Sequence, residues 1–327
     1  MSTILGSGEH RYRVIDNWAK LPDGWELKDV GAVAIDSKDC VYVFNRGEHP
    51  MIVFDADGNF IKSWGEGTFP RAHGLHIDEH DHLYCTDDGG HFVRKCDTEG
   101  RVLLEIGIPG TPTPYMSGRP FHRCTHTALS PKGEIYVSDG YGNARVHKYS
   151  PDGKLLMSWG EPGTDPGQFN IPHNIATDAD GWVYVADREN HRVQVFDGNG
   201  RYETQWVNMH RPCALCCQRD SKADGGMRFI IGELGPAWSV NRDHPNIGPR
   251  ITIVDGKGNT IMRLGDSDGP GPGLEAGRFI APHGLAVDGR GNIYVGEVSY
   301  TEYPRLFPNQ TIPWRMRSLQ KLEKIHD

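Results

Sequence analysis

The chain has 327 residues, of which 37% are hydrophobic and 24% charged, and its formal net charge is −8. With 41 glycines, 22 prolines and 9% aromatic residues, it has the composition of a globular protein rich in turns rather than of a disordered chain. The acidic balance argues against nucleic acid or a membrane surface as the main partner. We expect a small-molecule substrate instead, and the sequence sets no oligomeric state.

The cellular compartment is read from the start of the chain and from its cysteines. Residues 1–14 contain no apolar core of signal-peptide length, and no later run reaches about 18 apolar residues. Seven cysteines, an odd number, are expected as free thiols in a reducing compartment. We therefore expect a cytoplasmic protein.

The segment 135–196 contains the same sequence motif twice. IYVSD at 135–139 returns as VYVAD at 183–187, which gives a period of 48 residues. Within each copy, short alternating apolar runs are separated by turn residues, a pattern typical of antiparallel β-structure. Each copy is therefore predicted to be one four-stranded sheet.

Six copies can be followed along the chain. They begin at a shared position, the start of the first strand, at Gly31, His73, His126, His173, near Pro212, and His283. The fifth copy is enlarged by an insertion near 219–250. The sixth takes its third strand from 319–325 but lacks a fourth, whereas an unassigned strand lies at 12–18.

We predict that this N-terminal strand completes the last sheet and closes a ring. The fold expected is an all-β six-bladed propeller of antiparallel four-stranded blades, with residues 1–327 forming a single domain. An open solenoid of sheets is the alternative, but a split last sheet would have no purpose there.

The shared start position carries the main chemical signal. In a propeller, the first strand of each blade lines the central channel, so His73, His173 and His283 would approach the axis about 120° apart. Three converging imidazoles leave a coordination position open, which is typical of a catalytic metal site. We predict one divalent transition metal, zinc first, with iron, manganese and cobalt left open. His126 breaks this three-fold pattern and is expected to contact the substrate or a metal-binding residue rather than the metal. The alternative for all histidines at this position is that they only bond neighbouring carbonyls.

A second set of equivalent positions lies directly after the second strand of each copy. It places Arg46 and Arg188 three blades apart, on opposite sides of the axis, where two guanidinium forks suit a carboxylate. The alternative is that they pair with Glu48 and Glu189. Tyr141 follows the second strand of the third copy in a glycine-rich loop, where a phenol beside the channel could serve as general base or acid. A tyrosine in such a turn can also simply pack.

Several motifs resemble those of peptidyl-α-hydroxyglycine α-amidating lyase, within the wider group of NHL-repeat propellers. They occur in every copy except the enlarged fifth, as FNRGEH at 44–49, AHGLHID at 72–78, DGYGNAR at 139–145, IPHNIA at 171–176, VADRENHRVQVF at 185–196 and APHGLAVD at 281–288.

This resemblance implies a reaction and assigns roles in it. The family cleaves the C–N bond of a carbinolamide, N–CH(OH)–COO⁻, and releases an amide and glyoxylate. By motif, three zinc ligands fall on His73, His173 and His283. The catalytic base falls on Tyr141, and the arginines that flank the substrate fall on Arg46 and Arg188.

The sequence also departs from the family pattern. Gly284 stands where the family has an Asp that helps to bind calcium, so a structural calcium is not expected. Gly142 replaces a disulfide cysteine, and Ala281 replaces a methionine of the pocket. Substrate identity is expected to depend on the loops 109–123 and 235–250.

Three functions remain open on the sequence. The first is a metal-dependent lyase acting on a small α-hydroxyamide. The second is a lactonase-like or amidase-like hydrolase, which would use the same three histidines and their metal to activate water. The third is a non-enzymatic NHL platform that binds a protein partner and no metal.

Overall fold

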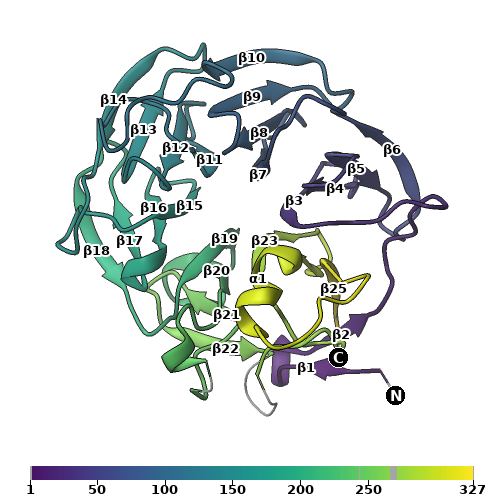
Figure 1. The fold of residues 1–327 in the computed structure, drawn as a ribbon. Coiled ribbons are helices and arrows are strands. Elements are labelled where there is room, and N and C mark those ends of the chain that lie inside the picture. Colours follow the sequence, from purple (N-terminus) through teal and green to yellow (C-terminus); the bar gives the residue numbers. More distant parts are fainter. Residues whose placement is uncertain (1, 243, 266–270, 327) are drawn as a thin grey trace. The chain divides into compact units, whose positions relative to one another are not determined.

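The computed structural model describes residues 2–242, 244–265 and 271–326. Its strands form six antiparallel blades in a ring, a six-bladed β-propeller, which confirms the predicted fold (Figure 1). The chain divides into two compact units, the first comprising Met1–Trp64 with Gln218–Asp327 and the second comprising Gly65–Cys217. That the whole chain acts as one domain stays a prediction.

The second unit contains three complete blades. Blade two is β7 (Ala72–Ile77), β8 (Leu83–Asp87), β9 (Phe92–Cys96) and β10 (Val102–Gly107). Blade three is β11 (His126–Leu129), β12 (Ile135–Asp139), β13 (Arg145–Tyr149) and β14 (Leu155–Trp159). Blade four is β15 (Pro172–Thr177), β16 (Val183–Asp187), β17 (Arg192–Phe196) and β18 (Tyr202–Trp206).

The first unit contains the other blades. Blade one is β3 (Val30–Ile35), β4 (Val41–Asn45), β5 (Met51–Phe54) and β6 (Phe60–Trp64). Blade five is β19 (Pro212–Arg219), β20 (Met227–Glu233), β21 (Arg250–Asp255) and β22 (Thr260–Leu264), and the unit boundary falls within β19. Blade six is β23 (Pro282–Val287), β24 (Ile293–Glu297), β25 (Leu319–Lys324) and β2 (Tyr12–Ile15).

Blade six confirms the predicted closure by the N-terminal strand. β2 pairs antiparallel with β25, and Tyr12 lies opposite Lys324. The short strand β1 (Ile4–Leu5) pairs with β2 and adds a fifth strand, which was not expected. The two ends of the chain thus complete one sheet.

The repeated motif, IYVSD in one copy and VYVAD in the next, forms a buried second strand, since all five residues of β12 and of β16 are buried. In β16, the hydroxyl of Tyr184 donates to Asp178 Oδ2 in the turn after the first strand at 2.8 Å, whereas in β12 the hydroxyl of Tyr136 donates to the carbonyl of Gly198 at 3.0 Å. Between blades three and four, aromatic rings such as Trp159 and Phe196 pack 5.9 Å apart. The repeat therefore encodes both the sheets and the apolar layers between them.

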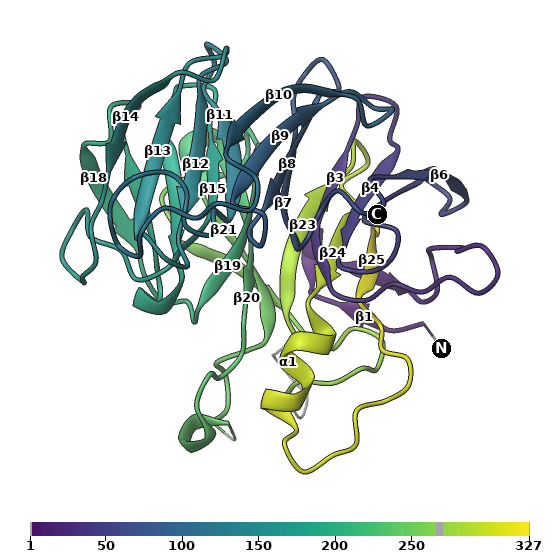
Figure 2. The same ribbon diagram turned by 45° about the horizontal axis from the view of Figure 1, so that its top comes forward.

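The predicted insertion of blade five consists of two loops, 220–226 and 234–249. The helix α1 (Ser299–Leu306) follows β24 and was not predicted. In Figure 2, α1 and the loop between β20 and β21 both extend beyond the strands of the first unit. Across the described residues, no helix has the length and apolarity needed to cross a membrane. All seven cysteines are free thiols.

Candidate active site

His73 and His173 occupy the same irregular position in their blades. The register between the first two strands passes from Ala72 opposite Asp87 to Gly74 opposite Thr86, and so skips His73. It skips His173 between Pro172 and Asn174 in the same way, and His283 between Pro282 and Gly284. A bulge of this kind adds one residue to a strand and re-aims its side chain.

Hydrogen bonds fix the protonation of these imidazoles. Nδ1 of each ring lies 2.7 Å from a backbone carbonyl oxygen, that of Thr125 for His73, Cys213 for His173 and Gly31 for His283. A carbonyl only accepts, so Nδ1 carries the hydrogen and Nε2 of the neutral ring keeps its lone pair. This arrangement is typical of metal-binding histidines. The alternative interpretation, that these histidines bond neighbouring carbonyls, is therefore compatible with a metal bound at Nε2.

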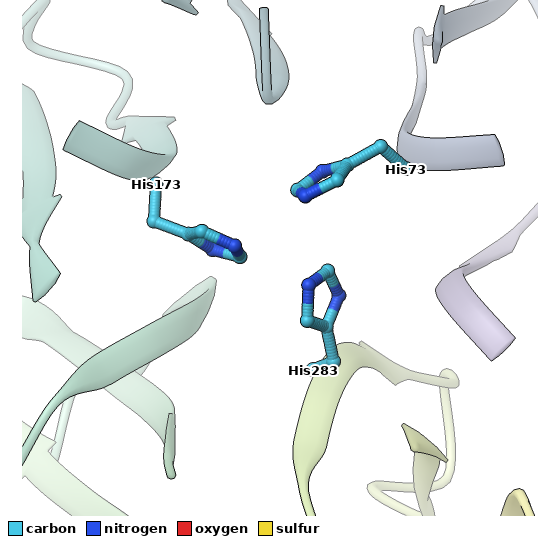
Figure 3. A group of neighbouring side chains, drawn as sticks. All are labelled: His73, His173 and His283. Atoms are coloured by element: carbon cyan, nitrogen blue, oxygen red, sulfur yellow. The ribbon is translucent and has the colours of Figure 1, made fainter. Parts of the chain in front are cut away.

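Three buried histidines form a group that could hold a metal ion. One nitrogen from each of His73, His173 and His283 lies within 4.8 Å of the others (Figure 3). Among the described histidine, cysteine, aspartate and glutamate residues, these three histidines are the group whose spacing suits a metal ion.

The phenol of Tyr141 bridges two of these rings. Its oxygen lies 3.0 Å from Nε2 of His73 and 3.0 Å from Nε2 of His173. One hydroxyl hydrogen can satisfy only one of these acceptors, so the phenol oxygen and the other nitrogen face each other with lone pairs. A cation shared by the imidazoles would relieve this repulsion, so these residues fit a metal.

Glycines on both sides allow Tyr141 to reach this position. A Cβ on Gly140 would lie 2.1 Å from the carbonyl oxygen of Pro172, and one on Gly142 would lie 2.0 Å from the ring of His122. The loop therefore packs too closely for any larger residue. The strand before it is fixed because Asp139, its last residue, accepts the backbone N–H of His122 at 3.0 Å.

Arg188 lies beside the same phenol. It follows β16, and its Nη1 lies 3.5 Å from the phenol oxygen, while its Nε donates to Glu189 at 2.7 Å. Burial opposes the charged form, but the neighbouring Tyr141 and Glu189 raise the pKa of Arg188 above its ordinary value. Arg188 therefore makes the contact with Glu189 that the sequence offered as an alternative and also lies beside Tyr141.

Arg46 is held by a carboxylate that the sequence did not indicate. Its Nη1 lies 3.4 Å from Asp29 Oδ2, and its backbone N–H donates to the carbonyl of Asp29 at 2.8 Å. Asp29 also accepts the backbone N–H of Tyr300 at 2.8 Å, at the start of α1. That Arg46 and Arg188 act on one substrate stays a prediction.

The structure does not bring His126 into the histidine group. His126 lies opposite Ser138, the residue before Asp139, just as Gly74 lies opposite Thr86, the residue before Asp87. The position equivalent to His73 is therefore Thr125, so the alignment from sequence is displaced by one residue in this blade. Nδ1 of His126 lies 3.0 Å from the carbonyl of Thr127. Burial, with a contribution from the neighbouring His76, lowers the pKa of His126 to about 3.

Sequence reasoning missed a further arginine at the site. The guanidinium carbon of Arg123 lies 4.6 Å from the centre of the Tyr141 ring. Its Nη2 donates to Oδ2 of Asp88 at 2.6 Å, and Nη1 of Arg71 donates to the same oxygen at 2.7 Å. Arg123 comes from the loop between β10 and β11, which carries no periodic signal.

Known proteins share the repeat and the fold of this chain. The NHL repeat model matches residues 169–196. Human NHL repeat-containing protein 3 is 34% identical over 320 residues, covering 92% of this chain and 86% of that protein. Drosophila melanogaster peptidyl-alpha-hydroxyglycine alpha-amidating lyase 1 is 30% identical over 259 residues, covering 75% of this chain and 46% of that protein. A virginiamycin B lyase from Staphylococcus aureus shares the fold, with a TM-score of 0.56 at 14% identity over 83% of this chain and 78% of its own.

Fold and repeat together define an NHL-repeat β-propeller, a class that includes enzymes. The length of the sequence match identifies the family within this class, because human NHL repeat-containing protein 3 aligns over 86% of its own length. The chain belongs to the family of NHL repeat-containing protein 3.

Proposed function

We propose that the protein is a metal-dependent lyase that cleaves the C–N bond of a small α-hydroxyamide. One observation carries the proposal: the phenol oxygen of Tyr141 lies 3.0 Å from Nε2 of both His73 and His173, and 3.5 Å from Nη1 of Arg188. A phenol, two imidazole nitrogens and a guanidinium cation thus meet at one point. The similarity to an amidating lyase supports the same reaction class.

The metal site would use the Nε2 atoms of His73, His173 and His283. Zinc is the first candidate because three neutral imidazoles and an open position are typical of catalytic zinc. When bound there, the ion supplies Lewis-acid polarisation of a substrate oxygen.

Tyr141 would move the proton that the reaction requires. The substrate is R–CO–NH–CH(OH)–COO⁻, and the phenolate of Tyr141 takes the proton of its hydroxyl group. The C–O bond becomes the C=O of glyoxylate, the C–N bond breaks, and its electron pair goes to nitrogen. The phenol then returns the proton to that nitrogen, which gives the amide R–CO–NH₂ with no net change in protons.

Arg188 would hold the substrate carboxylate beside Tyr141. Its guanidinium carbon lies 5.5 Å from the centre of the Tyr141 ring, so its charge acts on both groups. A guanidinium fork binds a carboxylate through two parallel hydrogen bonds, which orients the carbon that reacts. Arg46 would provide the second cation for the same carboxylate.

The test is glyoxylate release from N-benzoyl-α-hydroxyglycine by the full chain, with bound metal measured by mass spectrometry. The wild type is expected to contain about one transition metal per chain and to release glyoxylate. His173→Ala should lose both properties. His126→Gln should keep the metal, because His126 lies outside the histidine group.

Other outcomes identify the alternative functions. A metal-loaded protein that hydrolyses lactones or simple amides but releases no glyoxylate is a hydrolase of the kind the histidines alone would support. A folded wild type that binds no metal would overturn both enzymatic functions and favour a protein-binding platform.

A further inference from the structure

The buried carboxylate of Asp88 organises two arginines near Tyr141. Asp88 is 0% exposed and follows β8, the position that Arg188 holds after β16. Arg71 reaches it with Nη1 at 2.7 and 2.9 Å, and Arg123 reaches it with Nη2 at 2.6 Å and Nε at 3.0 Å. One carboxylate therefore fixes two guanidiniums, and the trio keeps a surplus positive charge.

Arg123 is held in a defined orientation and remains accessible. Its backbone is left-handed, with φ of 65°, and its N–H donates to Nδ1 of His91 at 3.0 Å. Asp88 takes the hydrogens of Nε and Nη2, so Nη1 makes no hydrogen bond in the described part of the chain. The Arg123 side chain is 41% exposed, so a ligand can reach these remaining donors.

Arg123 and Arg188 lie beside the same ring. Their guanidinium carbons are 4.6 and 5.5 Å from the centre of Tyr141, and each comes from a different blade or loop. Arg188 is needed for the carboxylate next to the reacting carbon. Arg123 therefore offers a second cation to another part of the same small molecule.

We propose that Arg123 forms a second anion-binding position, and that preferred substrates carry an acidic group on the amide that leaves, in addition to the α-carboxylate. The substrate class, which rests on the proposed lyase function, is an N-acyl-α-hydroxyglycine with an anionic acyl chain. An exposed guanidinium with its orientation already fixed loses little conformational entropy when a carboxylate binds. The position recognises charge, because a neutral acyl chain would leave the Nη1 donors in water.

The experiment compares two matched substrates, N-succinyl-α-hydroxyglycine and its neutral methyl ester on the succinyl group. The wild type should show a kcat/KM at least about tenfold higher for the acid, as expected for one charge-assisted hydrogen-bonded pair. Arg123→Gln should reduce that ratio to near one, and Arg123→Lys should give an intermediate ratio. Arg101→Gln is the control and should leave the ratio unchanged, because Arg101 is an exposed surface residue paired with Asp97.

A binding measurement separates this inference from the lyase function. N-succinylglycine lacks the hydroxyl group and cannot react, so calorimetry with it and with its methyl ester reports recognition alone. If neither substrate releases glyoxylate but the acid binds at least tenfold tighter in a manner that depends on Arg123, the lyase function fails and the anion position stands. If both substrates react equally well in the wild type, the anion position is overturned and the lyase function stands. This comparison needs no variant, so it holds even if Arg123→Gln does not fold.

Discussion

The phenol oxygen of Tyr141 lies 3.0 Å from Nε2 of His173. Tyr141 is held there from outside the imidazole, by two glycines in its loop that pack against neighbouring backbone and ring atoms. Its position should therefore survive the loss of the hydroxyl group.

Tyr141→Phe should separate chemistry from metal binding. The ring keeps its packing, so the variant should retain the metal content of the wild type while its kcat falls by roughly 10²–10⁴-fold, the usual contribution of a general base. Glyoxylate release and metal analysis on the same preparation check both parts. A variant that loses its metal would contradict this prediction, because the phenol would then be part of what holds the ion.

Arg188→Lys tests whether the guanidinium fork is needed. Lysine keeps the charge near Tyr141 and Glu189 but cannot form two parallel bonds with a carboxylate. We expect kcat/KM to fall by about 10- to 100-fold, in line with one charge-assisted hydrogen bond. Steady-state kinetics give the ratio, and the thermal unfolding midpoint shows whether folding is intact. Kinetics equal to those of the wild type would remove Arg188 from the substrate site.

The lowered pKa values of His126 and His76 predict how the stability of the fold depends on pH. Burial lowers the pKa of His76 to about 4 and that of His126 to about 3, both from 6.5. Between the folded pKa of each histidine and 6.5, the unfolded chain therefore binds more protons than the folded chain. The stabilisation is complete above pH 6.5 and is lost as pH falls toward the folded values, at a cost of up to about 2 kcal/mol per histidine at pH 5.

His126→Gln isolates this effect from the carboxylates. Urea denaturation at pH 7 and pH 5 should show a smaller loss of unfolding free energy in the variant, by up to about 2 kcal/mol. The difference between proteins cancels the titration of groups that both share. An equal loss in both proteins would mean that His126 is protonated in the folded chain.

Gly74→Ala tests the close approach of blades two and three. A Cβ at Gly74 would lie 2.4 Å from the carbonyl oxygen of Thr125, the oxygen that orients His73, and 2.8 Å from Cα of His126. Because both are backbone atoms, the variant should lose about 1–3 kcal/mol of stability and bind metal more weakly. At Gly289 the nearest atom lies 3.8 Å from an added Cβ, so Gly289→Ala is the matched control and should change stability by less than about 0.5 kcal/mol. Equal stability of the two variants would contradict the prediction.

The sequence predicted the blades and their closure because each blade repeats the same burial pattern. The pairing of β2 with β25 followed from one missing and one surplus strand. The alignment shifted at His126 because the repeat does not reveal which blades carry a bulge; His73 and His173 are bulged, whereas Thr125 precedes β11. A one-residue shift in a strand reverses the face of its side chain.

Two features had no periodic signal to predict them. α1 contains Pro304, and the residues that follow it, 307–314, contain two further prolines, so this part of the sequence shows no helical pattern. Arg123 reaches Tyr141 through a loop and a left-handed backbone, a conformation that non-glycine residues seldom adopt. By contrast, repeat position fixes where the side chains of His73, His173 and Tyr141 begin, and these three lie close together in the structure. Their roles stay a prediction.

The pairing of β2 with β25 also sets an order of events during synthesis. Each of blades two, three and four is built from consecutive strands, so it can form as soon as its own residues have left the ribosome. β2 precedes the strands of blades one to five in the chain, but its edge that pairs with β25 has no partner until Leu319–Lys324 emerge. During translation, its unpaired backbone groups are a site where chaperones or another nascent chain can bind, and completion of the sixth blade is necessarily a late step in folding.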